Sequence, residues 1–594
     1  MGDALGRGHP RRGPGMTQLA DAGPAPSPDA APGAERGPRR PRAVYVLGVV
    51  VLAILAYLVL SPLFYLAWRG LTTGEGFSLA NISAAYSVEG TPEMLVNSFV
   101  FAFGSAAVST VSGTALAFFC VRSNAPLKPL LYAASIVPLI IPGILFTIAW
   151  VFLLSEDVGV INILLRSVGL DFLQIDAFSL LGMALIDGMH LSPLVFLLMF
   201  AAFKATDPAL EESALMSGAS VPSVIRKVTL PLVRPALFGA ILVMVVRGLE
   251  SFETPAVLGI PSGNWVFTSR IYQALHTYPV RYDIAAIYSI SLLLLTVAGL
   301  LFVQRVNRRG ERFQTISGKG FRPRPLDLGR WRWPVSVLFA LYFVVVVVLP
   351  VAILVWMSLL PYYQTPSIDA LDTLTLRNYE RMFDMPGVVD AVRNSAILAV
   401  TSATAVMLFT SVVAWFVLKS RMRGARFLET LASFPLAMPG LVLGVALIFI
   451  YLRSPLPIYG TLLILFIAYV TRYLPYGIRY ATSSLGQVSA ELEDSAQMSG
   501  ATWRDTFRRV VVPLMAPGIV AGWVYIVVVS VRELSSSILL YSQDTRVLSV
   551  TIWELWENGE TGVLAAVGVV MVVALMILVG VAYKLGARVG VRDL

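Results

Sequence analysis

The sequence predicts an all-α polytopic membrane protein with about twelve transmembrane helices, arranged as two parallel six-helix repeats. Of its 594 residues 57% are hydrophobic and only 14% are charged, whereas soluble domains carry about 25% charged residues. Apolar runs such as residues 44–68 are long enough to cross a hydrocarbon core of about 30 Å. Backbone groups in lipid must pair internally, and these runs show no strict alternation, so we expect helices rather than a barrel.

The spans follow an N-terminal segment, residues 1–43, that is rich in Pro, Gly, Ala and Arg and lacks apolar periodicity. We expect this segment to be a disordered cytoplasmic tail. The first apolar run is too long for a signal-peptide core, so we expect it to be retained as a helix. The predicted spans lie near residues 44–68, 94–121, 129–154, 179–203, 236–258, 284–305, 333–359, 392–418, 427–452, 460–480, 515–540 and 562–587.

The distribution of basic residues predicts the orientation of these spans. With the N-terminus in the cytoplasm, the inner segments collect roughly thirty Lys and Arg residues against about eight in the outer segments. Both termini are therefore expected to be cytoplasmic. The net charge of +9 is carried by short loops at the surface of the lipid bilayer, so we expect no nucleic-acid partner.

An internal repeat divides the chain into two halves. Residues 211–235 and 493–517 match at 12 of 25 positions without a gap, 282 residues apart. Pro142-Gly143 recurs as Pro439-Gly440, 297 residues further on, so the second half lacks 297 − 282 = 15 residues between these features. Because each half holds an even number of spans, both halves have the same orientation and are related by an axis along the membrane normal.

The repeat also predicts the domain organisation, in which two transmembrane domains are joined by a basic cytoplasmic linker. The predicted segments are the tail at 1–43, a first transmembrane domain at 44–305, the linker at 306–332 and a second transmembrane domain at 333–594.

The repeated segment contains residues that are typical of helix ends, and their order predicts a compact helix–turn–helix. Asp207, which precedes a proline, is expected to cap the first helix, and Ser489 is expected to cap its second copy. Gly218 is expected to end the helix in the left-handed conformation. Pro231 and Pro513 are expected to break the next helix just before a span begins.

Two interpretations of this segment compete. A single loop of this kind is commonly an interfacial helix that only connects two spans, whereas two closely similar copies favour contact with a partner. Small residues such as Ser213 and Ala214 allow a partner to approach closely, and Glu212 and Asp494 place a carboxylate at one position in each copy.

These residues resemble the signature of the permease subunits of binding-protein-dependent ABC importers. That signature reads Glu-Ala-Ala, three residues, Gly, nine residues and Ile-x-Leu-Pro. The matching positions are Glu212, Ser213, Ala214, Gly218 and Pro231 in the first half and Asp494, Ser495, Ala496, Gly500 and Pro513 in the second. The departures are Ser for the first Ala, Val for Ile, Asp for Glu in the second copy and Val for Leu in the second copy.

The resemblance covers both halves and implies the type I ABC importer transmembrane fold in the bacterial inner membrane. It implies that each loop forms a coupling helix for a cytoplasmic ATPase, hence two ATPase copies, and that an extracytoplasmic solute-binding protein delivers the cargo. The sequence contains no phosphate-binding loop of the form G-x-x-x-x-G-K-[ST]. We therefore expect a transport subunit that is not an enzyme and binds no cofactor, while its partners use ATP and Mg.

The resemblance also suggests a substrate. Residues 249–259, 266–275, 531–540 and 548–559 resemble the ferric-iron-type group of fused permeases, which also includes thiamine, phosphonate and polyamine importers. We expect ferric iron and leave the others open. The topology alone also permits an ion-coupled secondary transporter with two parallel six-helix halves, although the duplicated loop argues against it. A membrane enzyme is disfavoured because the sequence shows no His/Cys cluster and no nucleophile–base motif.

Ionisable residues within spans are energetically expensive and therefore mark candidate functional positions. The candidates for a translocation pathway are Asp187, Glu250, Glu253, Arg532 and Glu533. In one interpretation the carboxylates pass a cationic or metal-bearing cargo. In the other, which we favour, Arg247 pairs with Glu250 and Arg532 pairs with an acidic neighbour, so that the charges hold helices together or form a gate. We expect His190 to bond a neighbouring helix, and the sequence identifies no metal ligands.

Overall fold

The computed structural model describes residues 42–73, 76–310, 325–420 and 424–588. In these residues ten helices are long and apolar enough to span a membrane, and counting each of two bent pairs of shorter helices as one span gives twelve. The expectation of about twelve spans is therefore confirmed. The predicted tail falls almost wholly on residues 1–41, outside the described residues. The predicted domain boundaries stay predictions.

The first half contains the helices that follow residue 42 and a two-residue antiparallel pair, β1 (Thr72–Thr73) and β2 (Gly76–Phe77). The helices are α1 (Arg42–Leu71), α2 (Ala80–Tyr86), α3 (Thr91–Arg122), α4 (Lys128–Ile136), α5 (Gly143–Leu154), α6 (Val160–Ser167), α7 (Leu180–Ala205), α8 (Ala209–Met216), α9 (Val221–Val224), α10 (Leu230–Glu250), α11 (Ile260–Ser262), α12 (Phe267–His276) and α13 (Tyr282–Gly310).

The second half repeats this order, with a shorter connection between α20 and α21 than between α5 and α7. Its helices are α14 (Arg332–Phe343), α15 (Leu349–Ser358), α16 (Ile368–Leu371), α17 (Arg377–Asp384), α18 (Val388–Leu418), α19 (Ala425–Ser433), α20 (Gly440–Tyr451), α21 (Leu462–Gly486), α22 (Ala490–Met498), α23 (Trp503–Thr506), α24 (Val512–Val531), α25 (Ser537–Leu540), α26 (Leu548–Glu557) and α27 (Thr561–Arg588).

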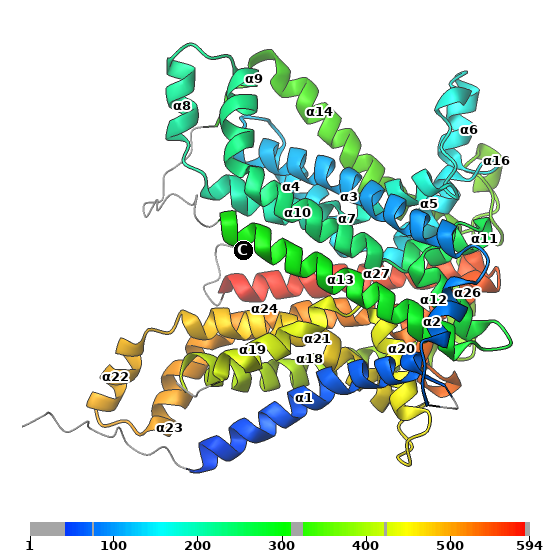
Figure 1. Ribbon diagram of the computed structural model, residues 1–594. Helices are drawn as coiled ribbons and strands as arrows, with labels where there is room; N and C mark the ends of the chain where they lie inside the picture. Colours follow the sequence, from blue (N-terminus) through cyan, green and yellow to red (C-terminus); the bar gives the residue numbers. More distant parts are fainter. Residues whose placement is uncertain (1–41, 74–75, 311–324, 421–423, 589–594) are drawn as a thin grey trace, which may run out of the picture. The chain divides into compact units, whose positions relative to one another are not determined.

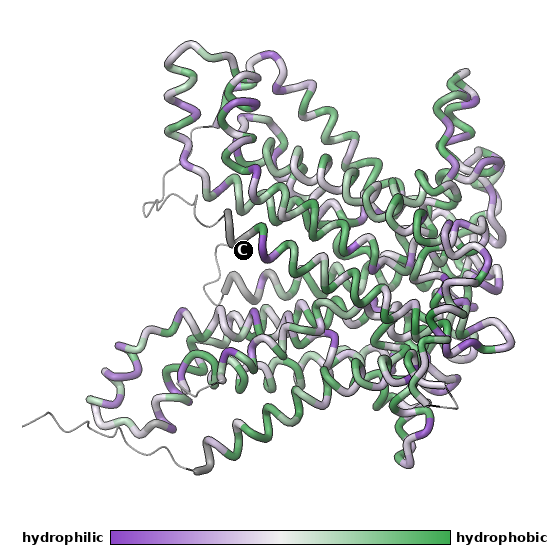
Figure 2. The backbone as a smooth tube through the Cα atoms, in the orientation of Figure 1, coloured by the Kyte–Doolittle hydropathy of each residue, from purple (hydrophilic) through white to green (hydrophobic). Residues whose placement is uncertain are grey.

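The two halves pack their helices in the same way (Figure 1). In the first half α3 lies against α7 and α10, and in the second α18 lies against α21 and α24. One cross-helix hydrogen bond recurs in both: the Ser98 hydroxyl accepts from the Phe267 N–H at 3.0 Å, and the Ser395 hydroxyl accepts from the Leu548 N–H at 2.7 Å. Apolar residues follow the long helices, and hydrophilic residues gather at the connections (Figure 2). The predicted six-helix repeat is confirmed.

The halves also interlock through their two most apolar helices. All twelve residues of α5 are buried, because this helix packs against α7 of its own half and against α15 and α26 of the other. Its counterpart α20 likewise contacts α12 and α13 of the first half. A helix enclosed on every side needs no polar face, which explains why neither sequence shows amphipathic periodicity.

The predicted spans at 129–154 and 427–452 each consist of two helices joined at a sharp bend. The helix pair that ends in α5 is bent by 107°, and the pair that ends in α20 is bent by 105°. Pro142 and Pro439 stand at the bends with ψ of 139° and 142°. A proline lacks the N–H that would continue the first helix and disfavours helical geometry in the residue before it, so each apolar run folds as two pieces.

The prediction that Pro231 and Pro513 break the helix is also wrong. The chain stays helical from each loop into the following span. A five-residue π-helical turn, η3 (Ile225–Thr229) or η9 (Phe507–Val511), ends two residues before each proline. We infer that this wider turn accommodates the proline ring and its missing N–H, so the helix continues past it. The same spacing recurs in η4 (Pro255–Gly259) before Pro261 and in η7 (Val344–Val348) before Pro350.

Candidate functional site

A short helix pair projects from the same end of each half, α8 with α9 and α22 with α23 (Figure 1). Both first helices end at a glycine in the left-handed region, Gly218 with φ +84° and Gly500 with φ +87°. The glycine N–H donates to the carbonyl three residues before it, at 3.0 and 2.9 Å, and the next N–H donates five residues back, at 3.1 Å in both copies. This is a Schellman end, and the expectation for Gly218 is confirmed.

The predicted caps have different outcomes. The Asp207 carboxylate accepts a hydrogen bond from the Ala209 N–H at 2.9 Å, so it caps α8 as expected. Ser489 occupies the N-cap position of α22, but its side chain makes no capping hydrogen bond, and that prediction is wrong. The residue is exposed, so water can satisfy the first amides of the helix instead.

The residues that match the permease signature lie mainly on uncovered faces of the two loops. Ser213 and Gly218 are exposed in the first loop, as are Ser495 and Gly500 in the second. An apolar side chain stands beside them in each copy: Met216 is 90% exposed, and its counterpart Met498 is 89% exposed. The exposed small or apolar residues are Leu210, Ser213, Met216 and Gly218 in α8 and its turn, and Leu492, Ser495, Met498 and Gly500 in α22 and its turn.

The opposite face of α8 is fixed by a residue that the sequence reasoning missed. Glu211, rather than Glu212, is buried, with its side chain only 3% exposed. Its carboxylate accepts a hydrogen bond from the Thr229 hydroxyl at 2.7 Å and lies 3.5 Å from the Arg122 guanidinium. Arg122 also donates to the carbonyl and the hydroxyl of Thr206, at 3.2 and 2.5 Å. These contacts tie α8 to the end of α3.

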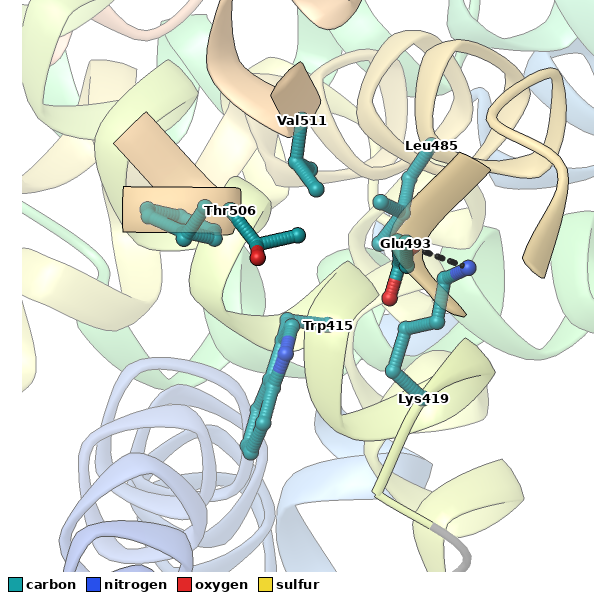
Figure 3. Close-up of a pocket in the computed structure, with 7 residues that line it drawn as sticks. Trp415, Lys419, Leu485, Glu493, Thr506 and Val511 are labelled. Carbon is teal, nitrogen blue, oxygen red and sulfur yellow. Dashed lines mark ion pairs between the residues drawn. The ribbon is translucent and has the colours of Figure 1, made fainter. Parts of the chain in front are cut away.

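The second half holds α22 by an equivalent but more exposed pair. Lys419 lies 297 residues after Arg122, and Glu493 lies 282 residues after Glu211. The Lys419 ammonium is 2.7 Å from the Glu493 carboxylate, and each side chain is 23% exposed. A small pocket adjoins this pair (Figure 3). Its lining residues are Trp415, Lys419, Leu485, Glu493, Thr506, Phe507 and Val511. In the sequence, these two ion pairs could have been found from the glutamate that occupies the same position in both copies, Glu211 and Glu493.

A second group of polar residues lies where the long helices α10 and α24 end. The Arg472 guanidinium is 3.0 Å from the Glu533 carboxylate, which is 8% exposed. The Tyr473 hydroxyl donates to the same carboxylate at 3.1 Å, and the Ser536 N–H and hydroxyl donate to its other oxygen, both at 3.1 Å. Glu533 is therefore fully hydrogen-bonded and acts as a structural anchor.

Two further arginines connect the halves. Arg247 pairs with Glu250 at 3.2 Å, as predicted, and also donates to the Tyr476 hydroxyl of the second half at 2.9 Å. Among the described residues Arg532 makes no close ion pair with an acidic side chain, although Glu253 lies within range of its charge, so the expected pairing is not found. Arg532 donates instead to the Leu139 carbonyl of the first half, because α24 ends at Val531 and Arg532 lies in the non-helical segment that follows.

The remaining acidic candidates surround the bend before α5. Asp187 is 4% exposed and accepts from the Ser251 hydroxyl at 2.7 Å, while its second oxygen has no hydrogen-bond partner in the described residues. Glu253 lies beyond the end of α10, and a Cβ at Gly143 would collide with its carboxylate. His190 contacts the Phe146 ring at 5.1 Å between ring centroids, and its Nδ1 finds no hydrogen-bond partner within the described ranges. The expected bond from His190 to a neighbouring helix is therefore absent at that nitrogen.

The residues described contain no group of three or more His, Cys, Asp or Glu side chains placed to hold a metal ion. Arg247 with Glu250 and Arg472 with Glu533 form ion pairs, and Asp187 is hydrogen-bonded to Ser251. The favoured interpretation, in which Arg247 pairs with Glu250, is thus confirmed for that pair, while a pathway role for Asp187 and Glu253 stays a prediction.

The sequence matches one protein family twice, over residues 109–312 and again over residues 407–590. That family is described as the binding-protein-dependent transport system inner membrane component. The chain belongs to this family. The duplicated match makes it a fused, two-half permease of an ABC importer, and this membership decides against the ion-coupled secondary transporter.

Curated relatives of the permease include ferric transport proteins. It is 28% identical over 481 residues to the ferric transport system permease protein FbpB of Actinobacillus pleuropneumoniae, covering 80% of this chain and 68% of the relative. It is 26% identical over 486 residues to the putative ferric transport system permease protein FbpB 1 of Haemophilus influenzae, covering 80% of this chain and 74% of that relative. A shorter match, 24% identical over 201 residues, is the spermidine/putrescine permease protein PotC of Haemophilus influenzae, covering 34% and 77%.

Solved structures with a similar chain include a bacterial ABC transporter involved in the import of the acidic polysaccharide alginate. The match has a TM-score of 0.39 and 19% identity and covers 46% of the permease and 97% of that chain. The permease is a multi-pass membrane protein, and its family places it in the bacterial inner membrane.

Proposed function

We propose that this permease imports ferric iron delivered by an extracytoplasmic binding protein, and that two ATPase subunits drive it from the cytoplasm. The observation that carries the proposal is the pair of matching helix ends at Gly218 and Gly500, each beside an exposed methionine and small residues. ATP and Mg are used by the partner subunits, and both termini lie on the ATPase side.

The proposed mechanism follows from the continuity of the helices. From each loop the chain stays helical through the π turn and the span, over Val221–Glu250 in the first half and Arg504–Val531 in the second. A helix of 30 residues is about 45 Å long. Movement of an ATPase at one end is therefore transmitted to the other end of the span. There Glu250 pairs with Arg247, and Arg532 donates to the Leu139 carbonyl of the first half.

Ferric iron is the proposed cargo because two relatives that cover four fifths of the chain are named as ferric transport permeases. The described residues form no metal-ligand cluster, so we assign recognition of the metal to the binding protein. The test is uptake of radioactive iron into proteoliposomes that contain the permease, its ATPase and its binding protein. Uptake of thiamine, a phosphonate or a polyamine in place of iron would contradict the proposed substrate.

The substitution Glu253→Gln tests whether an intramembrane carboxylate serves the cargo. The Glu253 carboxylate lies against Gly143, whereas that of Glu250 is paired with Arg247 at 3.2 Å. We expect the thermal unfolding temperature to stay within about 2 °C, because no buried pair is broken, and iron uptake to fall. Unchanged uptake would remove Glu253 from the pathway. Glu250→Gln, which loses the Arg247 partner, is the control for a structural effect.

A further inference from the structure

The contacts that hold α8 are much more enclosed than those that hold α22. The Arg122 and Glu211 side chains are 2% and 3% exposed, whereas those of Lys419 and Glu493 are each 23% exposed. Solvent screens an exposed pair, and side-chain motion weakens it further. The first anchor is therefore the stiffer of the two.

The first pair, Arg122 with Glu211, also has a hydrogen-bond donor beside it that the second pair, Lys419 with Glu493, lacks. Thr229 donates to the Glu211 carboxylate in the first half, and the equivalent position 282 residues later is Val511, which has no hydroxyl group. Val511 lines the small pocket beside the second pair (Figure 3). The Thr506 hydroxyl in that pocket has no hydrogen-bond partner among the described residues. The second anchor thus lacks the equivalent of the Thr229 hydroxyl donor and adjoins a pocket.

The first anchor is also braced by the segment that leads into the second half. The Leu326 N–H donates to the Arg122 carbonyl at 2.7 Å, and the Asn124 N–H donates to the Leu326 carbonyl at 3.1 Å. Asn124 also donates to the Asp327 carboxylate at 2.6 Å and accepts from the Leu328 N–H at 3.0 Å. These bonds fix the backbone of the residue whose guanidinium holds α8.

The charge of Asp327 supports this brace at neutral pH. The Gly329 N–H and the Asn124 side chain hydrogen-bond to the Asp327 carboxylate and lower its pKa below the usual value. The carboxylate is therefore ionised at neutral pH and available as an acceptor.

From these contacts we propose that the two coupling loops are mechanically unequal: α8 is held as a fixed element by Arg122, Thr229 and the linker residues, and α22 is held as a compliant one. Arg122 is a positioning residue, because it acts on the ATPase contact through Glu211. The proposal rests on the coupling role of the loops proposed above. It assigns the inter-half linker a role in the first ATPase contact in addition to joining the halves.

Amide hydrogen exchange on the purified permease tests the stiffness directly. The amides of α8 are expected to exchange at least about ten-fold more slowly than those of α22, because local opening must break a buried pair. Arg122→Lys combined with Thr229→Val copies the second anchor and should bring α8 to the rate of α22. The reverse exchange, Lys419→Arg with Val511→Thr, should slow α22. Equal rates in the unaltered permease would overturn the proposal.

Transport separates this proposal from the coupling role itself. In proteoliposomes with ATPase and binding protein, Arg122→Lys is expected to lower the cargo moved per ATP several-fold, and Lys419→Arg is expected to leave that ratio unchanged or raise it. A purely structural defect would lower the amount of folded protein but not this ratio. A ratio that neither variant changes, together with unequal exchange rates, would overturn the coupling role and leave the unequal stiffness standing. Equal losses from both variants would overturn the inequality.

Discussion

Replacing Gly218 and Gly500 together with valine is expected to uncouple ATP hydrolysis from transport while the permease still folds and inserts. Both glycines have positive φ, where an L-residue loses about 1–2 kcal/mol and a β-branched one loses more. A Cβ at either position would meet no atom of the chain within 4 Å. The strain therefore acts on the turn alone, changing the helix end that faces the ATPase.

The measurement compares ATP hydrolysis with cargo uptake in proteoliposomes that contain the partner subunits. Hydrolysis should continue, and the uptake per ATP should fall at least about ten-fold, which corresponds to about 1.4 kcal/mol of lost coupling. Gly559→Val is the matched control, since Gly559 also has positive φ (+72°) and open space around it but precedes α27, away from both loops. A double variant with the normal ratio of uptake to hydrolysis would defeat the coupling role.

The second large effect is expected from Glu533→Ala. The substitution removes the partner of Arg472, whose side chain is 21% exposed and lies among apolar helices. Glu533 is 8% exposed, and removing one partner of a pair leaves an uncompensated charge, which costs about 3–5 kcal/mol when the pair is fully buried. We therefore expect a large fall in the thermal unfolding temperature and in the yield of folded permease from membranes.

An exposed pair provides the control for this prediction. Arg381 and Glu560 are 3.1 Å apart with side chains 41% and 37% exposed, so Glu560→Ala should lower stability by less than about 1 kcal/mol. The double variant Arg472→Met with Glu533→Leu should recover much of the stability, because no charge is left unpaired. Equal losses from Glu533→Ala and Glu560→Ala would show that the intramembrane pair has no special structural role.

Local sequence patterns predicted the features that depend on neighbouring residues. Apolar run length gave the number of spans, the recurring segment gave the two halves, and the glycine at 218 gave a left-handed helix end that the structure contains. The length of an apolar run did not predict how a proline within it shapes the helix. Pro142 and Pro439 lie inside runs long enough to span the membrane, and the run length concealed a bend of more than 100°.

Contacts between distant parts of the chain were beyond local reasoning. Arg532 was expected to pair with an acidic neighbour, but folding also brings it to the Leu139 carbonyl, 393 residues away. Glu212 matches the family signature, but the buried carboxylate is that of Glu211, one position earlier. Helical periodicity separates such neighbours by about 100°, so only the partners, Arg122 and Thr229, reveal which carboxylate is the anchor.

The central claim is that one permease chain carries two ATPase contacts, and disulfide cross-linking tests it most directly. Cys120 is the only cysteine, so Cys120→Ala provides a cysteine-free background for single cysteines at the exposed positions Met216 and Met498. With single cysteines on the ATPase surface, each site should link to one ATPase, and the double variant should give a product of one permease with two ATPases. A product that never exceeds one ATPase per permease, or no link at either position, would contradict the account.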